Sequence, residues 1–330
     1  MINSNTIDNI ANEKCGRARY APSPTGQLHL GNMQTALAAW LHARLSGYEY
    51  ILRIEDLDFR RCRVKFTEQI IEDLTWLGLD WDIGPGRTDS SAGYLQSERN
   101  DLYIVALQKL IQNELLFPCI CSRKKLEMHR GTTYGKLGLV YPGDCRQKTF
   151  VAKPDLTNKK QPGYALRMLA GEGDCSFDDH IFGHQRVNLK TDVGDFVVNR
   201  KDGVVAYHLA VVVDDIAQGI TDIVRGADLL DSVFPQSLIY KALGEPRPRY
   251  WHMPLREDID GEKLSKRSAS PALADMRKEG FSVEAVLGLL AEGLGLIEVD
   301  SGPVSLNELL HSYTVETMQS AIKKRLQHSV

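Results

Sequence analysis

The stretch from Arg19 to Asn32, R-Y-A-P-S-P-T-G-Q-L-H-L-G-N, most constrains what this chain can fold into. A short apolar-alternating segment leads through a turn rich in proline and glycine to the start of a helix. Parallel α/β folds build nucleotide sites in this way, because the N–H groups of the first helical turn lack intrahelical partners and lie at the positive end of the dipole. Gly26 and Gly31 leave room for close backbone approach. His29 is then placed to donate hydrogen bonds to phosphate oxygens as charge develops in a transition state.

A second phosphate-directed feature lies far along the chain. Lys263 to Arg267, K-L-S-K-R, is a basic loop that follows Asp260-Gly261-Glu262. The motif His29-Leu30-Gly31-Asn32 is weak evidence by itself. It gains weight from this partner, since both segments would serve a bound polyphosphate. The sequence therefore predicts a nucleotide site flanked by two phosphate-directed segments.

Composition sets the outer bounds on function. With 330 residues, 43% hydrophobic and 25% charged, the chain is typical of a globular protein. Its net charge of −3 predicts no general affinity for nucleic acid, so any RNA contact must come from local basic patches. The candidate patches are Arg123–Arg130, Arg146–Lys160 and Lys323–Arg325.

Segments that would direct the chain to a membrane or an oxidising compartment are missing from the sequence pattern. No run of about 18 apolar residues could cross a bilayer. Met1 to Lys14 lacks the basic start and apolar centre of a signal peptide. Six cysteines, two of them as C-x-C, suit a reducing compartment with a metal site better than a disulfide framework. We therefore expect a cytoplasmic protein without membrane contact, and a monomer.

The order of elements predicts an α/β fold interrupted by an insertion. Strands are expected at 17–23 and 48–54, and helices at 31–46, 66–77 and 94–116. The composition of the sequence changes at Phe117. The chain after it is rich in Gly, Pro and Lys, with short strand-like segments at 164–169 and 181–187. Regular α/β sequence resumes at Phe196. It repeats the order of strand, turn and helix from Ile220 and ends in helices over 271–330.

Cys119-Ile120-Cys121, followed by Tyr141-Pro142-Gly143-Asp144-Cys145, suggests a metal site in this insertion. Two thiolates one residue apart, with a third returning after a loop, suit one tetrahedral structural zinc ion whose bonds replace the core that a short module lacks. Three cysteines leave the fourth ligand open. The alternative is that these are ordinary reduced cysteines and that no metal binds.

Taken together, these motifs resemble those of the class I aminoacyl-tRNA synthetases. His29 to Asn32 is similar to their H-I-G-H signature, and Lys263 to Arg267 to their K-M-S-K-S loop. The segments R-Y-A-P-S-P-T-G from Arg19 and L-R-I-E-D-L-D from Leu52 resemble the glutamyl branch of that class. The resemblance implies a Rossmann-type parallel sheet with an inserted zinc-containing α+β module and a C-terminal helical part.

The resemblance also implies five regions along the chain. They are a mobile arm (1–16), the first half of the catalytic domain (17–116), the inserted acceptor-type module (117–190), the second half of the catalytic domain (191–258), and a lysine-loop and stem-contact region without an anticodon-binding domain (259–330).

Site residues follow from the same resemblance. The glutamate pocket would be formed by Arg19, Tyr20, Ala21, Pro22, Ser23, Glu55, Tyr207 and Arg225. Charged groups in a closed site need partners, so the two arginines would answer the carboxylates of glutamate and Glu55 its ammonium group. Which arginine takes which carboxylate stays open. In short relatives zinc is held by C-x-C followed by Y-x-x-x-C, which adds Tyr141 to the three cysteines; His129 and Tyr134 compete as the fourth ligand.

The mechanism implied by the resemblance is adenylation of glutamate followed by acyl transfer. ATP with Mg²⁺ would be bound by Pro22, His29, Gly31, Asn32 and Lys266, and catalysis would come from His29, Lys266 and Lys263 through positioning and charge stabilisation. Two departures from the family pattern stand out. Asn32 replaces the second histidine of the signature, and Leu264 and Arg267 replace Met and Ser in the lysine loop.

The short chain after Arg267 narrows the resemblance further. Only residues 268 to 330 follow, where a full glutamyl-tRNA synthetase carries a large anticodon-binding region. From Arg17 to about residue 325 the chain is most similar to the truncated glutamyl-Q tRNA(Asp) synthetases. For that family the implied reaction is tRNA-independent activation of L-glutamate and its transfer to the queuosine base of tRNA(Asp). The choice of acceptor depends wholly on the resemblance.

Three other functions stay open from the sequence. The first is a glutamyl- or glutaminyl-tRNA synthetase core that charges the 3′ end of tRNA. The second is a nucleotidylyltransferase with a similar nucleotide site, against which the lysine loop and the cysteines argue. The third is a non-catalytic RNA-binding protein derived from a synthetase, which would not need His29, Glu55, Arg225 and Lys266 together.

Overall fold

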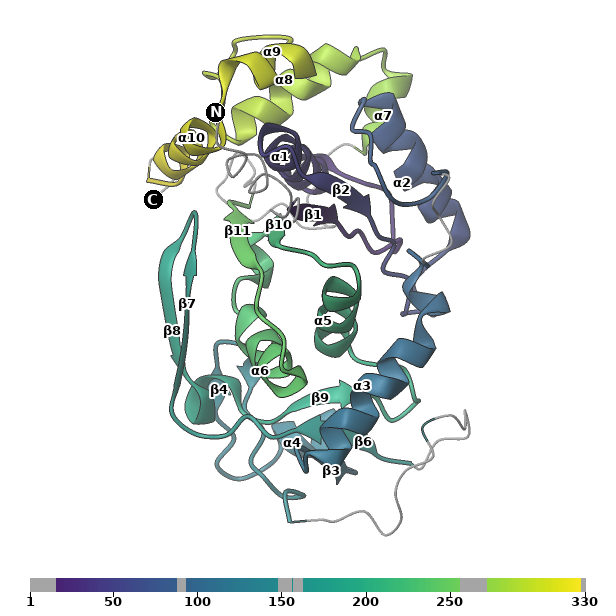
Figure 1. Ribbon diagram of the computed structural model, residues 1–330, viewed down its shortest axis with the longest axis vertical. Helices are drawn as coiled ribbons and strands as arrows, with labels where there is room; N and C mark the ends of the chain where they lie inside the picture. The colour runs from purple at the N-terminus through teal and green to yellow at the C-terminus, as the bar shows by residue number, and fades with distance from the viewer. Residues whose placement is uncertain (1–15, 88–92, 148–155, 157–162, 256–271, 328–330) are drawn as a thin grey trace, which may run out of the picture.

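The protein is described here by a computed structural model (Figure 1). Its described residues are 16–87, 93–147, 156, 163–255 and 272–327. Most of the predicted N-terminal arm, and the whole of the lysine loop with Lys263 and Lys266, therefore lie outside the described residues.

A six-stranded sheet in the order β2-β1-β10-β11-β7-β8 forms the centre of the fold. Neighbouring strands run parallel from β2 to β7, and β8 closes the edge as an antiparallel partner of β7. The inner strands β1, β10 and β11 are buried on both faces, although each carries charged or polar side chains, which find partners inside the protein. The strands are β1 (Arg17–Tyr20), β2 (Glu49–Leu52), β7 (Asp174–Asp179), β8 (Gly183–Asn188), β10 (Asp222–Gly226) and β11 (Arg249–Met253).

Helices cover both faces of this sheet (Figure 1). Helix α1 (Leu30–Leu45) lies between β1, β2 and β10 on one side and the C-terminal helices α8 and α9 on the other. It is therefore buried almost all round, as its run of Ala, Leu and Trp requires. The opposite face is covered by α3 (Asn100–Gln112), α5 (Tyr207–Ala217) and α6 (Val233–Leu243), which share a second apolar cluster with Ile51 and Ile223.

The other described elements of the α/β part are one helix and three short turns. They are α2 (Val64–Trp76), the 3-10 turns η1 (Gln96–Glu98) and η3 (Ala227–Leu229), and the π-helical turn η2 (Leu189–Val193).

The predicted long helix over 94–116 is wrong. The chain instead forms η1, then α3, and Glu114 adopts a left-handed backbone conformation with φ 57° that ends the helical segment. The apolar residues after it form the strand β3 (Leu116–Cys119). The predicted strand 181–187 is also shifted, because Ile181 and Phe182 form a turn in which both N–H groups donate to Asp179 Oδ1 at 2.9 Å.

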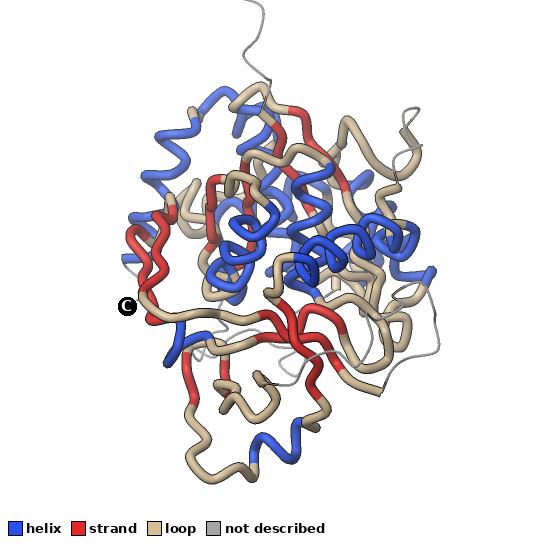
Figure 2. The backbone as a smooth tube through the Cα atoms, turned by 60° about the horizontal axis from the view of Figure 1, so that its bottom comes forward, coloured by secondary structure: helices blue, strands red, loops and turns tan. Residues whose placement is uncertain are grey.

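The insertion contains a separate three-stranded antiparallel sheet, β3-β6-β9, and a short hairpin, β4-β5. Figure 2 shows this lower part of the molecule, where strands and loops predominate. Strand pairing crosses the predicted boundary at residue 190: β7 and β8 join the main sheet, whereas β9 pairs with β6 of the insertion. The elements are β4 (Tyr134–Gly135), β5 (Gly138–Leu139), β6 (Ala165–Met168), β9 (Phe196–Asn199) and α4 (Arg123–Glu127).

The C-terminal part is helical in its described residues, as predicted. Helices α8 and α9 pack on α1, so this part covers one face of the sheet rather than standing apart. None of the helices in the described part of the chain has the length and apolar character that crossing a bilayer demands. The helices are α7 (Leu273–Lys278), α8 (Val283–Gly293), α9 (Leu306–Ser312) and α10 (Val315–Gln327).

Candidate active site and cysteine cluster

A pocket of about 540 Å³ opens at the carboxyl ends of β1, β2, β10 and β11. In open α/β sheets this edge is where ligands bind, at the point where the strand order reverses. Every described residue predicted for the nucleotide or glutamate site lines this one pocket. They are Arg19, Tyr20, Ala21, Pro22, Ser23, His29, Gly31, Asn32, Glu55, Tyr207 and Arg225.

One end of the pocket is the N-terminus of α1. His29 is the N-cap residue, and the Asn32 side-chain oxygen accepts a hydrogen bond from the His29 N–H at 3.4 Å in a capping box. Asn32 at this position therefore stabilises the start of the helix. A Cβ atom on Gly31 would lie 3.3 Å from the His29 ring, so a side chain there would crowd the histidine. The positive dipole end of the helix lies at the pocket, which favours an anion.

The segment that carries the lysine loop starts and ends at this pocket. Pro254 and Leu255, the last described residues before it, line the pocket. Ala272, the first described residue after it, pairs with His29 in an antiparallel bridge, and the Leu273 N–H donates to the Leu28 carbonyl at 3.1 Å. Both flanks of the loop are thus held beside the N-terminus of α1.

A network of buried charges holds the next part of the pocket wall. The Asp215 carboxylate accepts two hydrogen bonds from Arg19, at 3.2 and 3.3 Å, and one from Arg53 at 2.7 Å. Arg53 also donates to Glu55 at 3.2 Å. Arg19 and Glu55 line the pocket, whereas Arg53 and Asp215 lie behind them with side chains at most 1% exposed. Arg53 and Asp215 therefore fix the positions of Arg19 and Glu55 in the pocket wall.

The buried ion pair of Arg99 and Asp214 extends this network to α3. Asp214 accepts hydrogen bonds from Arg99 at 2.6 Å, from Gln96 at 2.7 Å and from the Tyr103 hydroxyl at 3.0 Å. With Asp215, Glu55 and three arginines, the network has three positive and three negative groups and is neutral as a whole. Burial raises the pKa of Glu55, opposed by Arg53 and Arg19, so this carboxylate would gain from a cationic ligand.

Arg225 is held from behind by a histidine. Its Nε–H donates to His252 Nε2 at 3.0 Å, and its other donors meet the Gln236 side chain and the Leu229 carbonyl, each at 3.0 Å. Since an arginine can only donate, His252 must carry its proton on Nδ1, which donates to Asp179 at 2.6 Å. Burial lowers the pKa of His252 despite its bond to Asp179, which keeps the ring neutral. Asp179 and His252 therefore orient Arg225 in the pocket.

Tyr207 closes the pocket between these groups. It is the first residue of α5 and is 36% exposed, with its ring edge toward His208. The pocket lining thus contains two tyrosines, two arginines and two carboxylates, Glu55 and Asp228, around the N-terminus of α1. A small molecule with both carboxylates and an ammonium group, bound beside a polyphosphate, fits this set of partners.

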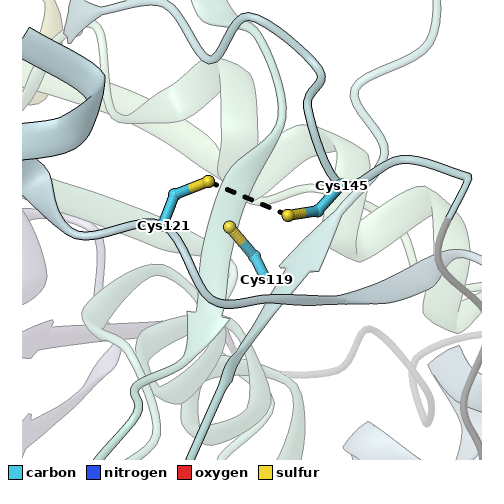
Figure 3. A group of neighbouring side chains, drawn as sticks. All are labelled: Cys119, Cys121 and Cys145. Carbon is cyan, nitrogen blue, oxygen red and sulfur yellow. Dashed lines mark hydrogen bonds between the residues drawn. The ribbon is translucent and has the colours of Figure 1, made fainter. Parts of the chain in front are cut away.

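The three cysteines of the insertion converge on one point. Figure 3 shows the Cys119, Cys121 and Cys145 side chains directed toward one another, and their sulfur atoms all lie within 4.8 Å of each other. Burial, together with the neighbouring Cys119, raises the pKa of the Cys121 thiol to about 11. Three thiolates need a cation between them, and the group would suit a soft divalent ion such as zinc.

The neighbours of the cysteines bear on the fourth ligand. The Tyr141 hydroxyl lies 3.5 Å from Cys119 Sγ and 3.9 Å from Cys121 Sγ, whereas Tyr134 is 70% exposed in β4. His129 Nε2 meets the Asp144 carboxylate at 3.2 Å. The small apolar cluster around these groups contains Phe117, Leu126, Tyr141 and the buried cysteines. A metal would therefore cross-link a module that has little core of its own.

Comparison with known proteins decides the family. A family model described as tRNA synthetases class I (E and Q), catalytic domain, matches residues 17–325. The glutamyl-Q tRNA(Asp) synthetase of Symbiobacterium thermophilum is 46% identical over 299 residues, covering 90% of this chain and 91% of the relative. The protein of the same name from Nitratidesulfovibrio vulgaris is 42% identical, covering 91% of this chain and 94% of the relative. The chain belongs to the glutamyl-Q tRNA(Asp) synthetase family.

The fold of this glutamyl-Q synthetase family member is similar to part of a longer enzyme of known structure. The crystal structure of a glutamate tRNA ligase from Elizabethkingia meningosepticum in complex with its amino acid aligns with a TM-score of 0.77 at 28% identity. The alignment covers 93% of this chain but 66% of the ligase. The predicted class I synthetase fold is confirmed, and the assignment of roles to single pocket residues stays a prediction.

Four residues that hold the site of this glutamyl-Q family member were not predicted as site residues: Arg53, Asp179, Asp215 and His252. Their signal in the sequence is charge or imidazole inside apolar segments. Arg53 follows the buried Tyr50–Leu52, Asp215 ends an apolar run from Val204, and His252 interrupts the apolar strand β11. Buried polar groups of this kind need partners, but the sequence does not say which.

Proposed function

We propose that this chain activates L-glutamate with ATP, without requiring tRNA, and transfers the glutamyl group to the queuosine base of tRNA(Asp). The observation that carries the proposal is the single pocket in which Arg19, Arg225 and Glu55 face the N-terminus of α1. Family membership supplies the identity of the RNA acceptor.

In this proposal the pocket recognises glutamate by charge. The guanidinium groups of Arg19 and Arg225 pair with the two carboxylates of glutamate, and the Glu55 carboxylate pairs with its ammonium group. Arg19 has only its Nε and one terminal nitrogen committed to Asp215, so donors remain for the ligand. Tyr20 to Ser23 and Tyr207 enclose the carbon chain.

The first step is formation of the adenylate. A carboxylate oxygen of glutamate attacks the α-phosphorus of ATP, and the bond from that phosphorus to the bridging oxygen breaks, so that pyrophosphate leaves with the electron pair. His29 and the N–H groups near Gly31 stabilise the charge on the phosphates. Lys266, with Lys263, would also stabilise the negative charge on the phosphates, because both flanks of their loop lie at the pocket. Mg²⁺ would enter with ATP and neutralise part of the polyphosphate charge.

The second step transfers glutamate to RNA. A hydroxyl oxygen of queuosine attacks the acyl carbon of the adenylate, the bond from that carbon to the phosphate oxygen breaks, and AMP leaves. The proton of the hydroxyl passes to the departing phosphate or to solvent, and AMP takes the electron pair of the broken bond. No side-chain nucleophile is required, so the chain's task is to position the hydroxyl and to exclude water.

The cysteine cluster has a structural role in this proposal. Cys119, Cys121 and Cys145, with Tyr141 as the fourth ligand, would hold one zinc ion and cross-link the insertion, which has little core of its own. In this proposal the five regions predicted from the sequence are the functional parts of the chain, except that the hairpin β7-β8 belongs to the catalytic sheet. The reduced cysteines and the tRNA substrate fit a cytoplasmic enzyme.

The experiment that tests the first step is ATP-pyrophosphate exchange with glutamate, glutamine or aspartate, each with and without tRNA. Exchange with glutamate alone and in the absence of tRNA is the expected result. Exchange that appears only when tRNA is added would favour a conventional glutamyl-tRNA synthetase core. No exchange with any of the three amino acids would contradict the proposal.

A further inference from the structure

The segment between β2 and α2 carries an unusual set of exposed side chains. Residues 58–66, D-F-R-R-C-R-V-K-F, which we term the rim segment, contain four exposed cations: Arg60, Arg61, Arg63 and Lys65. Phe59 is 63% exposed and Val64 75% exposed, so an aromatic ring and an isopropyl group face water beside these charges. Basic side chains interleaved with exposed aromatic rings are typical of surfaces that bind single-stranded nucleic acid.

The rim segment is attached to the mouth of the pocket. The Arg63 N–H donates to the Pro24 carbonyl at 3.1 Å, between the pocket residues Ser23 and Thr25. The Cys62 thiol lies 3.8 Å from the carbonyl oxygen of Glu55, whose side chain lines the pocket. A molecule that lies on the rim segment is therefore next to residues that line the pocket.

Two of the four cations are occupied within the segment. Arg61 donates to Asp58 at 2.7 Å, and the Arg63 side chain donates to the carbonyls of Phe59, Arg60 and Cys62, which shapes the loop. Among the described residues, Arg60 and Lys65 have no carboxylate partner; their cations lie 5.9 and 5.0 Å from the rings of Phe59 and Phe66. Within the described residues, these two charges are therefore not neutralised by a carboxylate, and they and the Phe59 ring are exposed to solvent.

We propose that the rim segment binds the unpaired loop of the acceptor RNA, with Phe59 stacked on an exposed base and Arg60 and Lys65 on the adjoining phosphates. Sequence-specific RNA recognition usually targets unstacked bases in loops, which stack on aromatic or guanidinium planes. The chain has a net charge of −3, so a local cationic patch beside the active site is what its RNA contact requires. The identity of the RNA depends on the proposed function; the surface itself does not.

The test compares Phe59→Ala and the double variant Arg60→Ala/Lys65→Ala with matched controls. Phe281→Ala removes an aromatic ring that is 40% exposed, and Arg186→Ala removes an exposed cation on β8, at the left of Figure 1, whereas the rim segment joins β2 and α2 at the right. Each protein is assayed for glutamate-dependent exchange without RNA, for binding of tRNA(Asp) that carries queuosine, and for the dependence of that binding on salt.

The expected result separates the two steps of the reaction. Phe59→Ala should weaken RNA binding about 5- to 150-fold, the range for loss of one base-stacking ring. The double variant should lower the slope of log affinity against log salt by about 1.4 to 1.8, since each lost phosphate contact removes about 0.7 to 0.9. The exchange rate of the rim variants, and the RNA affinity of the two control variants, should stay within twofold of the starting protein. The melting temperature of the rim variants should be unchanged.

Unchanged RNA affinity and salt slope in both rim variants would overturn the proposal, as would equal losses in the two controls. Failure of the proposed function gives a different pattern. In that case the starting protein itself shows no glutamate-dependent exchange, whereas the binding measurements still decide whether the rim segment holds RNA.

Discussion

Asp215→Asn should destabilise the protein strongly, although it changes a single oxygen for an amide nitrogen. Asp215 is 1% exposed and accepts hydrogen bonds from Arg19 and Arg53. The substitution keeps the shape of the side chain but removes one negative charge from a network of three carboxylates and three guanidinium groups. One buried positive charge is then uncompensated.

The magnitude follows from the cost of a buried charge without its partner, about 3–5 kcal/mol of unfolding free energy. For 330 residues the entropy of unfolding near 60 °C is about 0.7 kcal/mol per kelvin, so the melting temperature should fall by about 4–7 °C. The matched control is Asp178→Asn. That side chain is 85% exposed and meets His184 at the surface, where an ion pair contributes about 1 kcal/mol or less.

The pH dependence gives a second, independent readout. Burial alone would raise the pKa of Asp215, but the charges and hydrogen bonds of Arg19 and Arg53 lower it below its ordinary value. A carboxylate with a lowered pKa stabilises the fold above the unfolded value of about 3.9, and this stabilisation is lost as the pH falls through the lower, folded value. The difference between the starting protein and Asp215→Asn should be full at pH 7 and shrink below about pH 4.

Thermal unfolding followed by circular dichroism at pH 7, 5 and 3 measures both effects. A fall of less than about 2 °C at pH 7, or a difference that is as large at pH 3 as at pH 7, would refute the account of a balanced buried network. A fall as large in Asp178→Asn would show that the effect is not one of burial.

Three further predictions test other parts of the site. His252→Phe removes the acceptor that orients Arg225. A hydrogen bond to a charged group is worth about 1.5–3 kcal/mol, so the KM for glutamate in pyrophosphate exchange should rise about tenfold or more, with a smaller change in kcat. A fall in kcat of the same size with an unchanged KM would contradict a positioning role. Lys266→Ala should lower the rate of exchange about 100- to 1000-fold while thermal stability is kept, and normal exchange would exclude the lysine loop from the mechanism. Metal analysis should find about one zinc per chain, reduced in Cys119→Ser but not in the control Cys175→Ser, and equal zinc in both variants would exclude the cysteine cluster as its site.

Local chemistry explains what could be predicted from the sequence. Helix α1 was expected at 31–46 and occupies Leu30–Leu45, because the cap residues and the apolar spacing that define it are adjacent in the chain. All described residues predicted for the pocket lie around one cavity, since motifs at the carboxyl ends of parallel strands meet at the same edge. Family membership confirmed the resemblance that brought these motifs together.

Non-local contacts explain what could not be predicted. Strand β7, D-C-S-F-D-D, alternates between exposed and buried positions without an apolar run, so it was overlooked. Its last residue, Asp179, meets His252 across 73 positions of the chain, and no local pattern encodes that pairing. The partners of Asp215 lie 196 and 162 positions away. Charged residues inside apolar segments can be recognised in the sequence, but only the folded structure shows which of them form ion pairs with each other.

The most direct test of the account is attachment of labelled glutamate to an anticodon stem-loop of tRNA(Asp) whose 3′ end is blocked by phosphate. The chain is incubated with ATP, labelled glutamate and stem-loops that carry either queuosine or guanosine at the wobble position. The account predicts label on the queuosine stem-loop alone. Labelling of full-length tRNA only at its free 3′ end, with none on the queuosine stem-loop, would contradict it.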